Sequence, residues 1–188
     1  MTFWHRWQAH YQSMSGWQRM LLDGVLVTLL LMLVLLWNTR HLLDTHQPAP
    51  VLQGLLLATP PAAIPDQAAA HAEAQQHYQV EWHSPRTLVY FFAPWCNVCR
   101  VSMPELQWLP SEGLQIVAVA LDWQSGQEVA EMIRKTGFTG TVLLANSDIA
   151  RSWQIRGYPT YYVVDQQGYI RHQDTGLTTP PGLWLRTR

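Results

Sequence analysis

The chain has 188 residues, 13% of them charged, and its formal net charge is −1. A near-neutral balance excludes the strong positive field of a typical nucleic-acid binder, and two cysteines are too few for a disulfide-scaffolded fold. The length allows one globular domain of about 100–150 residues plus a further segment.

A long apolar run near the N-terminus predicts a membrane anchor. Residues 20–37 read MLLDGVLVTLLLMLVLLW, which at about 1.5 Å per residue nearly crosses a hydrocarbon core of about 30 Å. The one charge, Asp23, lies near the start, and Trp17 and Trp37 bracket the run as interfacial aromatic residues do. A buried core helix needs a polar face, and a cleaved signal peptide needs small residues after the run, where NTRHLLDTH stands instead. We therefore expect an uncleaved transmembrane helix.

Arginines on the two sides of this run predict its orientation. Arg6 and Arg19 precede the run and Arg40 follows it, an excess of one that favours a cytoplasmic N-terminus. The remaining chain has no second apolar run of comparable length, so it lies on one side of the membrane. We expect residues 1–19 to be a short cytoplasmic segment and the C-terminal part to lie outside the cytoplasm.

Residues 38–79 are expected to form a linker with a possible short helix. Prolines that break regular structure occur at Pro48, Pro50, Pro60, Pro61 and Pro65. Asp66 can cap a helix over residues 66–78. The apolar residues 51–58 are too few to cross a bilayer, so they lie either on the membrane or against the following domain.

Residues 80–188 begin with the pattern of a β-α-β unit. Residues 87–92 and 115–121 are continuous runs of apolar, β-forming residues, typical of strands that are covered on both faces. Residues 96–109, between these strands, have room for one helix.

Helix caps organise the second half of this region. Ser125 and Glu128 form the capping pattern S-x-x-E, Gly137 is a helix stop, and either Asn146 or Ser147 can cap a further helix. The expected elements are a helix at 127–137, a strand at 141–145, a helix up to Trp153, and a hairpin of strands at 160–165 and 169–175 with its turn at 166–168. This alternation predicts an α/β fold with a central mixed sheet flanked by helices.

The two cysteines, Cys96 and Cys99, directly follow the first of these strands as C-x-x-C. A zinc site needs about four ligands, and His71, His77 and His83 match no standard ligand pair. A structural bridge over so small a loop restrains little chain entropy. A helix start, in contrast, places the first sulfur against unpaired N–H groups, which stabilise the attacking thiolate. We therefore expect a redox-active disulfide, with Cys96 as the exposed nucleophile and Cys99, one turn inside, as the resolving thiol.

The sequence around this pair resembles the thioredoxin superfamily. FFAPWCNVCR, residues 91–100, resembles the active-site strand and Trp-Cys-x-x-Cys motif, and Pro104 matches the proline that kinks the family's active-site helix. RGYPT, residues 156–160, resembles the loop whose cis-proline faces the disulfide, which implies that Pro159 is cis. The resemblance covers about residues 87–175 and implies a thioredoxin-like fold.

With the N-terminal anchor, the chain is similar to membrane-tethered thiol–disulfide oxidoreductases of the TlpA/ResA/DsbE type. The stretch from Cys96 to Pro159 is longer than in plain thioredoxin and admits an extra strand and helix. The similarity implies a single-pass protein of the bacterial inner membrane with its C-terminal domain in the periplasm. It also implies exchange with extracytoplasmic protein disulfides or dithiols, usually as a reductant recharged by a DsbD-type membrane electron donor. Neither a cofactor nor a metal is expected, and nucleic acid is not an expected partner.

Three residues near the cysteines are expected to bind substrate. Tyr158 and Pro159 would flank the disulfide, where a backbone edge can pair with a substrate peptide as an added strand. Trp95, beside Cys96, either contributes to a substrate surface or shields the thiol.

The chain departs from the family where a carboxylate would assist the resolving thiol. Thioredoxin has a buried aspartate at the position of Tyr90, and some TlpA-type members have an acid at the position of Ser102. Glu105 is close in sequence but is expected at the surface, since glutamate is seldom buried unpaired. The proton acceptor for Cys99 is therefore left open.

Two other functions fit a C-x-x-C pair on this fold. Two thiolates suit Cu(I), so a copper-binding or copper-delivery module is an alternative, although copper-delivery proteins of the Sco type have C-x-x-x-C with a distant histidine. A noncatalytic docking factor is a second alternative.

Overall fold

The computed structural model describes residues 15–39, 42–57, 76–110 and 112–187, and it divides the chain into two compact units, Met1–His41 and Leu42–Arg188. In the first unit, helix α2 spans Gly16–Thr39, and its part Gly16–Val34 is long and apolar enough to cross a membrane. The hydroxyl of Thr28 donates to the carbonyl of Gly24 at 2.8 Å, so this polar group is satisfied within the helix. The helix contains the whole predicted anchor, while residues 1–14 of the predicted cytoplasmic segment lie outside the described residues.

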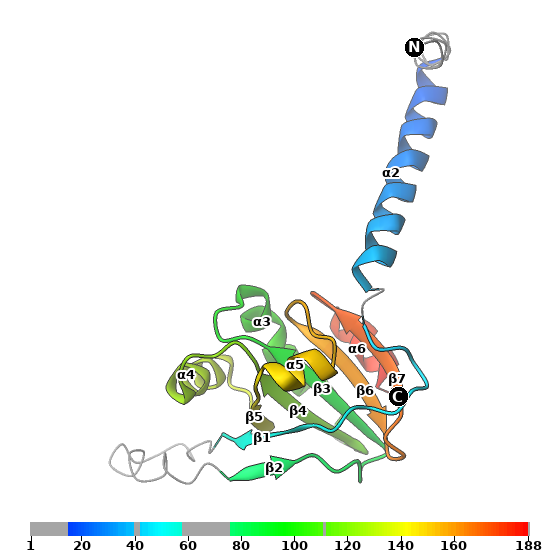
Figure 1. The fold of residues 1–188 in the computed structure, drawn as a ribbon. Helices are drawn as coiled ribbons and strands as arrows, with labels where there is room; N and C mark the ends of the chain where they lie inside the picture. The colour runs from blue at the N-terminus through cyan, green and yellow to red at the C-terminus, as the bar shows by residue number, and fades with distance from the viewer. Residues whose placement is uncertain (1–14, 40–41, 58–75, 111, 188) are drawn as a thin grey trace. The chain divides into compact units, whose positions relative to one another are not determined.

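The second unit contains one mixed sheet of seven strands in the order β2-β1-β5-β4-β3-β6-β7 (Figure 1). Strands β3, β4 and β5 are parallel to one another, and the other neighbours pair antiparallel. The bounds are β1 Gln53–Leu56, β2 His77–Gln79, β3 Arg86–Phe92, β4 Leu114–Ala120, β5 Thr141–Leu144, β6 Thr160–Asp165 and β7 Ile170–Thr175. The predicted mixed sheet, its β-α-β unit and its hairpin are confirmed.

Two of these strands come from residues that the sequence assigns to the linker. Strand β1 pairs with β5, with Leu55 opposite Leu144, and β2 pairs with β1. A Cβ on Gly54 would lie 2.6 Å from the Leu144 carbonyl oxygen, so glycine permits this close approach. Residues 51–57 therefore lie against the domain, and the compact unit begins at Leu42 rather than at residue 80.

The possible helix at residues 66–78 falls mostly outside the described part of the chain. Residues 66–75 are not described, and His77 and Tyr78 belong to strand β2. Strands as short as β1 and β2 have little local signal because the hydrogen bonds that define them come from distant residues.

The helices follow the predicted caps. Ser125 accepts the N–H of Glu128 at the start of α4, Gly137 ends that helix with φ of 68°, and Asn146 caps α5. The bounds are α3 Asn97–Ser102, α4 Gly126–Thr136, α5 Ser147–Ser152 and α6 Pro180–Arg186. The single helix expected at 96–109 is instead α3 followed by a 3-10 helix, η1 Met103–Trp108, because Pro104 has no N–H to continue the α-helical bonds.

Two hydrophobic cores cover the two faces of the sheet. One core joins the sheet to α3, η1, α4 and α6, and the other joins it to α5 and to residues 42–52. Thr87–Phe92 of β3 are completely buried between them, as the continuous apolar run predicts. Trp153 is fully buried in the second core, and Trp123 is half-buried, with its ring N–H donating to Ala145 O at 2.9 Å.

Candidate active site

Three loops meet at the carboxyl end of β3. The segment containing Cys96 follows β3, and Asp122 follows the parallel neighbour β4, where Leu121 N–H donates to Phe92 O at 2.9 Å. Thr160 pairs with Phe91, so Pro159 stands at the start of antiparallel β6 near the same end. The topology therefore gathers residues that are far apart in the sequence at one edge of the sheet, where α/β folds commonly place their sites.

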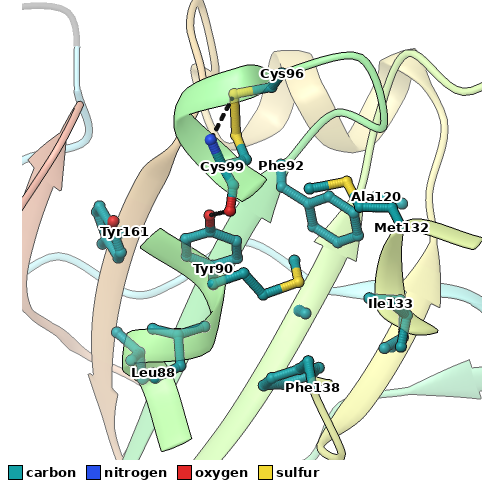
Figure 2. Packing of buried hydrophobic residues seen from close by; sticks show 14 of the residues in the cluster. Leu88, Tyr90, Phe92, Cys96, Cys99, Ala120, Met132, Ile133, Phe138 and Tyr161 are labelled. Carbon is teal, nitrogen blue, oxygen red and sulfur yellow. Dashed lines mark hydrogen bonds between the residues drawn. A yellow bond between two sulfur atoms is a disulfide. The ribbon is translucent and has the colours of Figure 1, made fainter. Parts of the chain in front are cut away.

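The two cysteines form a disulfide, with 5.3 Å between their Cα atoms. Cys96 is the N-cap residue of α3, and its sulfur accepts a hydrogen bond from Cys99 N–H at 3.1 Å (Figure 2). This is the contact that the sequence predicts for the first sulfur. In the reduced protein a donor at this position stabilises a Cys96 thiolate over the thiol.

Cys96 is less exposed than the sequence predicts. Cys96 is 6% exposed and Cys99 is completely buried, so Cys96 is the more accessible thiol but is not an exposed one. The bond to the sulfur of buried Cys99 holds the Cys96 side chain against the domain. A partner disulfide must therefore approach Cys96 closely to be attacked.

A pair of hydroxyl groups lies beneath Cys99, from the two residues at which the resemblance implies an aspartate in thioredoxin and an acid in some TlpA-type members. Tyr90 is completely buried, and its hydroxyl donates to Cys99 O at 3.3 Å (Figure 2). The same hydroxyl lies 2.9 Å from Ser102 Oγ. Ser102 Oγ also donates to Val98 O at 3.1 Å. The two bonds of Tyr90 connect β3 to Cys99 and to Ser102, the last residue of α3, and so position the helix that follows Cys96 and contains Cys99.

The groups beneath Cys99 are neutral at physiological pH. Burial raises the pKa of Tyr90 far above its ordinary value, and burial raises the pKa of Tyr161, beside it, to about 12. Within the described ranges, Asp165 is the only buried carboxylate, and it lies opposite Arg86 at the other end of β3. Glu105 is half-buried in the first turn of η1. No fully buried carboxylate of the described chain therefore lies beneath the resolving thiol.

The structure also brings together the residues expected to bind substrate. The Tyr158–Pro159 bond is cis, as the resemblance implies. The ring of Tyr158 packs edge-on against Trp95, with 5.7 Å between the ring centroids, and Trp95 is 58% exposed beside Cys96. A ring from each of two loops therefore forms an aromatic surface next to the disulfide.

The backbone of the proline loop is only partly paired. Pro159 O accepts a hydrogen bond from Gly176 N–H at 2.8 Å, which ties the loop to the end of β7. Within the residues whose placement is described, the N–H and C=O of Tyr158 make no backbone hydrogen bond. Tyr158, rather than Pro159, therefore offers a free backbone edge beside the disulfide.

The chain matches the AhpC/TSA family over residues 61–173, more than half of its length. It belongs to the AhpC/TSA family. This match includes β3, the Cys96–Cys99 pair, the proline loop and most of the β6–β7 hairpin. It confirms the predicted resemblance of the chain to thioredoxin-like proteins.

Among curated proteins, the chain is 34% identical over 101 residues to a thioredoxin-like protein of Haemophilus influenzae, a match covering 53% of this chain and 60% of that protein. It is 31% identical over 94 residues to the thiol:disulfide interchange protein DsbE of Allochromatium vinosum, covering 48% of this chain and 51% of the relative. The chain thus spans little more than half the length of the curated relatives it matches.

Solved structures confirm the thioredoxin-like fold. A thiol:disulfide interchange protein from Chlorobium tepidum superposes with a TM-score of 0.59 at 20% identity, covering 77% of this chain and 95% of that one. StoA from Bacillus subtilis superposes with a TM-score of 0.56 at 20% identity, covering 75% of this chain and all of StoA.

One residue of the site in this AhpC/TSA-family chain, Asp122, is not predicted by the sequence motifs. The hydroxyl of Tyr158 donates to Asp122 Oδ2 at 2.9 Å, across 36 positions of sequence. The sequence does carry a signal for Asp122, because this residue directly follows an apolar strand and the carboxyl ends of strands in α/β folds often carry functional side chains.

Proposed function

We propose that the chain is a thiol–disulfide oxidoreductase that exchanges disulfide for dithiol with partner proteins, working as a reductant. The observation that carries this proposal is the disulfide-bonded Cys96–Cys99 pair at the start of a helix, with Cys99 N–H donating to Cys96 Sγ. The names of the curated relatives, among them thiol:disulfide interchange proteins, support the same activity.

In this proposal the two cysteines have separate roles. The Cys96 thiolate attacks a partner disulfide and forms a mixed disulfide, and one partner thiol is released. Cys99 then loses its proton and attacks Cys96 Sγ, which releases the second partner thiol and restores the internal disulfide. No fully buried carboxylate of the described residues lies beneath Cys99, and Glu105 in η1 is half-buried, so we propose that the proton of Cys99 leaves to solvent as the mixed disulfide opens the site.

Trp95, Tyr158 and Pro159 are proposed to form the substrate surface. Trp95 and Tyr158 offer an aromatic surface beside Cys96, and the free backbone groups of Tyr158 suit an extended peptide that adds as a strand. We assign Trp95 a substrate-binding role rather than a purely shielding one, because 58% of the residue is exposed beside Cys96.

We further propose that the chain is anchored in a bacterial inner membrane by residues 20–37, with the cysteines in the periplasm. The apolar helix α2 and the flanking arginines support this arrangement. A DsbD-type membrane protein is the proposed electron donor that returns Cys96 and Cys99 to the dithiol state.

Reporter fusions test the proposed orientation. Alkaline phosphatase fused after Arg188 is expected to be active in a bacterial host, because this enzyme requires the oxidising periplasm for its own disulfides. A reporter that is active only in the cytoplasm, fused at the same position, is expected to be inactive. The opposite pair of results would place the cysteines in the cytoplasm.

Insulin reduction with parallel copper titration tests the activity itself. The wild-type chain is expected to accelerate the reduction of insulin disulfides by dithiothreitol, and Cys96→Ser is expected to return the rate to that of dithiothreitol alone, because the attacking thiolate is removed. Stoichiometric Cu(I) binding without reductase activity would favour the copper alternative, and neither activity would favour a docking factor.

A further inference from the structure

The loop after β4 places a carboxylate beside the proposed substrate surface. Asp122 follows β4 with a backbone φ of 49°, a left-handed conformation that aspartate tolerates better than most residues. The next residue anchors the loop, since the ring N–H of Trp123 donates to Ala145 O at 2.9 Å. Buried Leu121, whose N–H donates to Phe92 O, and hydrogen-bonded Trp123 therefore fix the backbone on the two sides of Asp122, whose side chain is exposed.

An unbroken series of contacts connects this carboxylate to the disulfide. Asp122 Oδ2 accepts the hydroxyl hydrogen of Tyr158 at 2.9 Å, and the ring of Tyr158 packs against Trp95, the neighbour of Cys96. Burial, and then the bond to Asp122, raise the pKa of Tyr158 above its ordinary value, so the phenol stays a neutral donor. Asp122 therefore both holds Tyr158 in place and brings a negative charge to the site.

No cation among the described residues forms an ion pair with the carboxylate of Asp122. Two arginines on the other loops of the site have different surroundings: Arg100, on α3, donates to Pro94 O and Asn97 Oδ1, and Arg156 is exposed in the proline loop. The bond from neutral Tyr158 leaves the carboxylate with its full charge and with lone pairs for another donor.

We propose that Asp122 is a specificity residue that favours partner proteins with a lysine or arginine next to their reactive cysteine. This inference rests on the proposed function and names its substrate class. The substrate is an extended segment whose apolar side chain packs on Trp95 and Val98 and whose cationic side chain pairs with Asp122. Trp95 is 58% and Val98 43% exposed, so both are available to such a segment.

The preference acts on the first step of exchange. In the single-turnover reaction, the reduced protein loses two electrons to one peptide disulfide: Cys96 sulfur bonds one peptide sulfur while the peptide S–S bond breaks, and Cys99 then displaces the second peptide thiol. The two released thiolates take up the protons that Cys96 and Cys99 lose. A cation beside the peptide cysteine lowers the free energy of the docked state by its attraction to Asp122.

Synthetic peptide disulfides test the proposal. Symmetric disulfides of short peptides that contain one cysteine and one leucine would carry lysine, glutamine or glutamate at the position before or after the cysteine. Pre-reduced full-length protein in detergent would be mixed with each, and released peptide thiol would be followed by chromatography. We expect the lysine peptide to react about two- to fivefold faster than the glutamate peptide in at least one position, the range of an exposed ion pair, with a smaller ratio at high salt.

Three variants separate charge from positioning. Asp122→Asn keeps an oxygen that accepts the Tyr158 hydroxyl but removes the charge, so the lysine-to-glutamate ratio is expected to fall to about one. Tyr158→Phe removes the tether but keeps the charge, so the ratio is expected to stay above one. Glu112→Gln makes the same charge change before β4, at the other end of that strand, and is expected to leave the ratio at its wild-type value.

The outcomes distinguish this inference from the proposed function. Exchange with every peptide but without a charge preference, or a preference that persists in Asp122→Asn, would overturn the role of Asp122 and leave the exchange activity intact. A ratio lost equally in Glu112→Gln would show a net-charge effect and would also overturn it. Absence of exchange with all peptides would refute the proposed function, and the inference with it.

Discussion

Cys99→Ser is expected to abolish turnover and to accumulate mixed disulfides with partner proteins. The variant loses the internal attacker, while Cys96 remains the N-cap of α3, where residue 99 still supplies its N–H to the Cys96 sulfur. Cys96 therefore still opens a partner's disulfide, but the resulting mixed disulfide has no resolving thiol. Non-reducing gels of bacterial extracts should show adducts that disappear on reduction, and mass spectrometry of these adducts would identify the partners.

Cys96→Ser is the matched control. Cys99 is completely buried, so we expect this variant to form no adducts, and Cys96→Ser/Cys99→Ser should behave in the same way. Adducts with Cys96→Ser but not with Cys99→Ser would reverse the assigned roles. Adducts with neither single variant would favour the docking or copper alternative.

Substitutions of Tyr90 are expected to cause the largest loss of stability at the site. Tyr90→Ala empties a completely buried position between β3 and α3, and large-to-small changes of aromatic core residues lower the free energy of unfolding by about 3–5 kcal/mol. Tyr90→Phe keeps the ring but removes the phenol hydroxyl, so Ser102 Oγ and Cys99 O each lose their hydrogen bond to it. The loss expected for this variant is about 1–3 kcal/mol.

Denaturant unfolding of the chain in mild detergent, followed by tryptophan fluorescence, would measure both losses. Tyr169→Phe is the control, because Tyr169 is 43% exposed and a surface substitution of this kind changes stability by no more than about 0.5 kcal/mol. Equal stability of Tyr90→Phe and the wild type would mean that the hydroxyl pair makes no net contribution. The difference in the free energy of unfolding between Tyr90→Ala and Tyr90→Phe gives the contribution of the aromatic ring.

A buried hydroxyl pair in place of a carboxylate has a consequence for proton transfer. A carboxyl group beneath Cys99 would titrate with its own pKa, whereas the phenol of Tyr90 has a pKa raised by burial and stays neutral. The described residues thus offer Cys99 hydrogen-bond donors and dipoles but no buried base. Resolution of the mixed disulfide is then tied to the access of water to Cys99, which is completely buried in the disulfide form.

The local pattern of the sequence by itself determined most of the elements around the site and the pairing of the two cysteines. The run from Thr87 to Phe92 consists of β-forming and apolar residues, which is typical of a strand covered on both faces, and the structure buries all of it. Ser125, Gly137 and Asn146 act on backbone groups a few positions away, so their caps were readable without the fold. The spacing of Cys96 and Cys99 is equally local, and it identified the disulfide and the order of exposure of its two thiols.

The tertiary structure alone decided what depends on pairing between distant residues. Strand β1 forms because it pairs with the edge of β5, about ninety positions later in the sequence, with Leu55 opposite Leu144. The four residues of β1 carry no pattern that encodes this pairing. The hydroxyl of Tyr90 finds Ser102 only because α3 folds back over β3. Asp122 reaches Tyr158 only because β4 and β6 lie on the two sides of β3 and bring their loops to the same end of the sheet. Side-chain contacts of this kind follow from strand order and register, which are set by the packing of the whole domain rather than by neighbours in sequence.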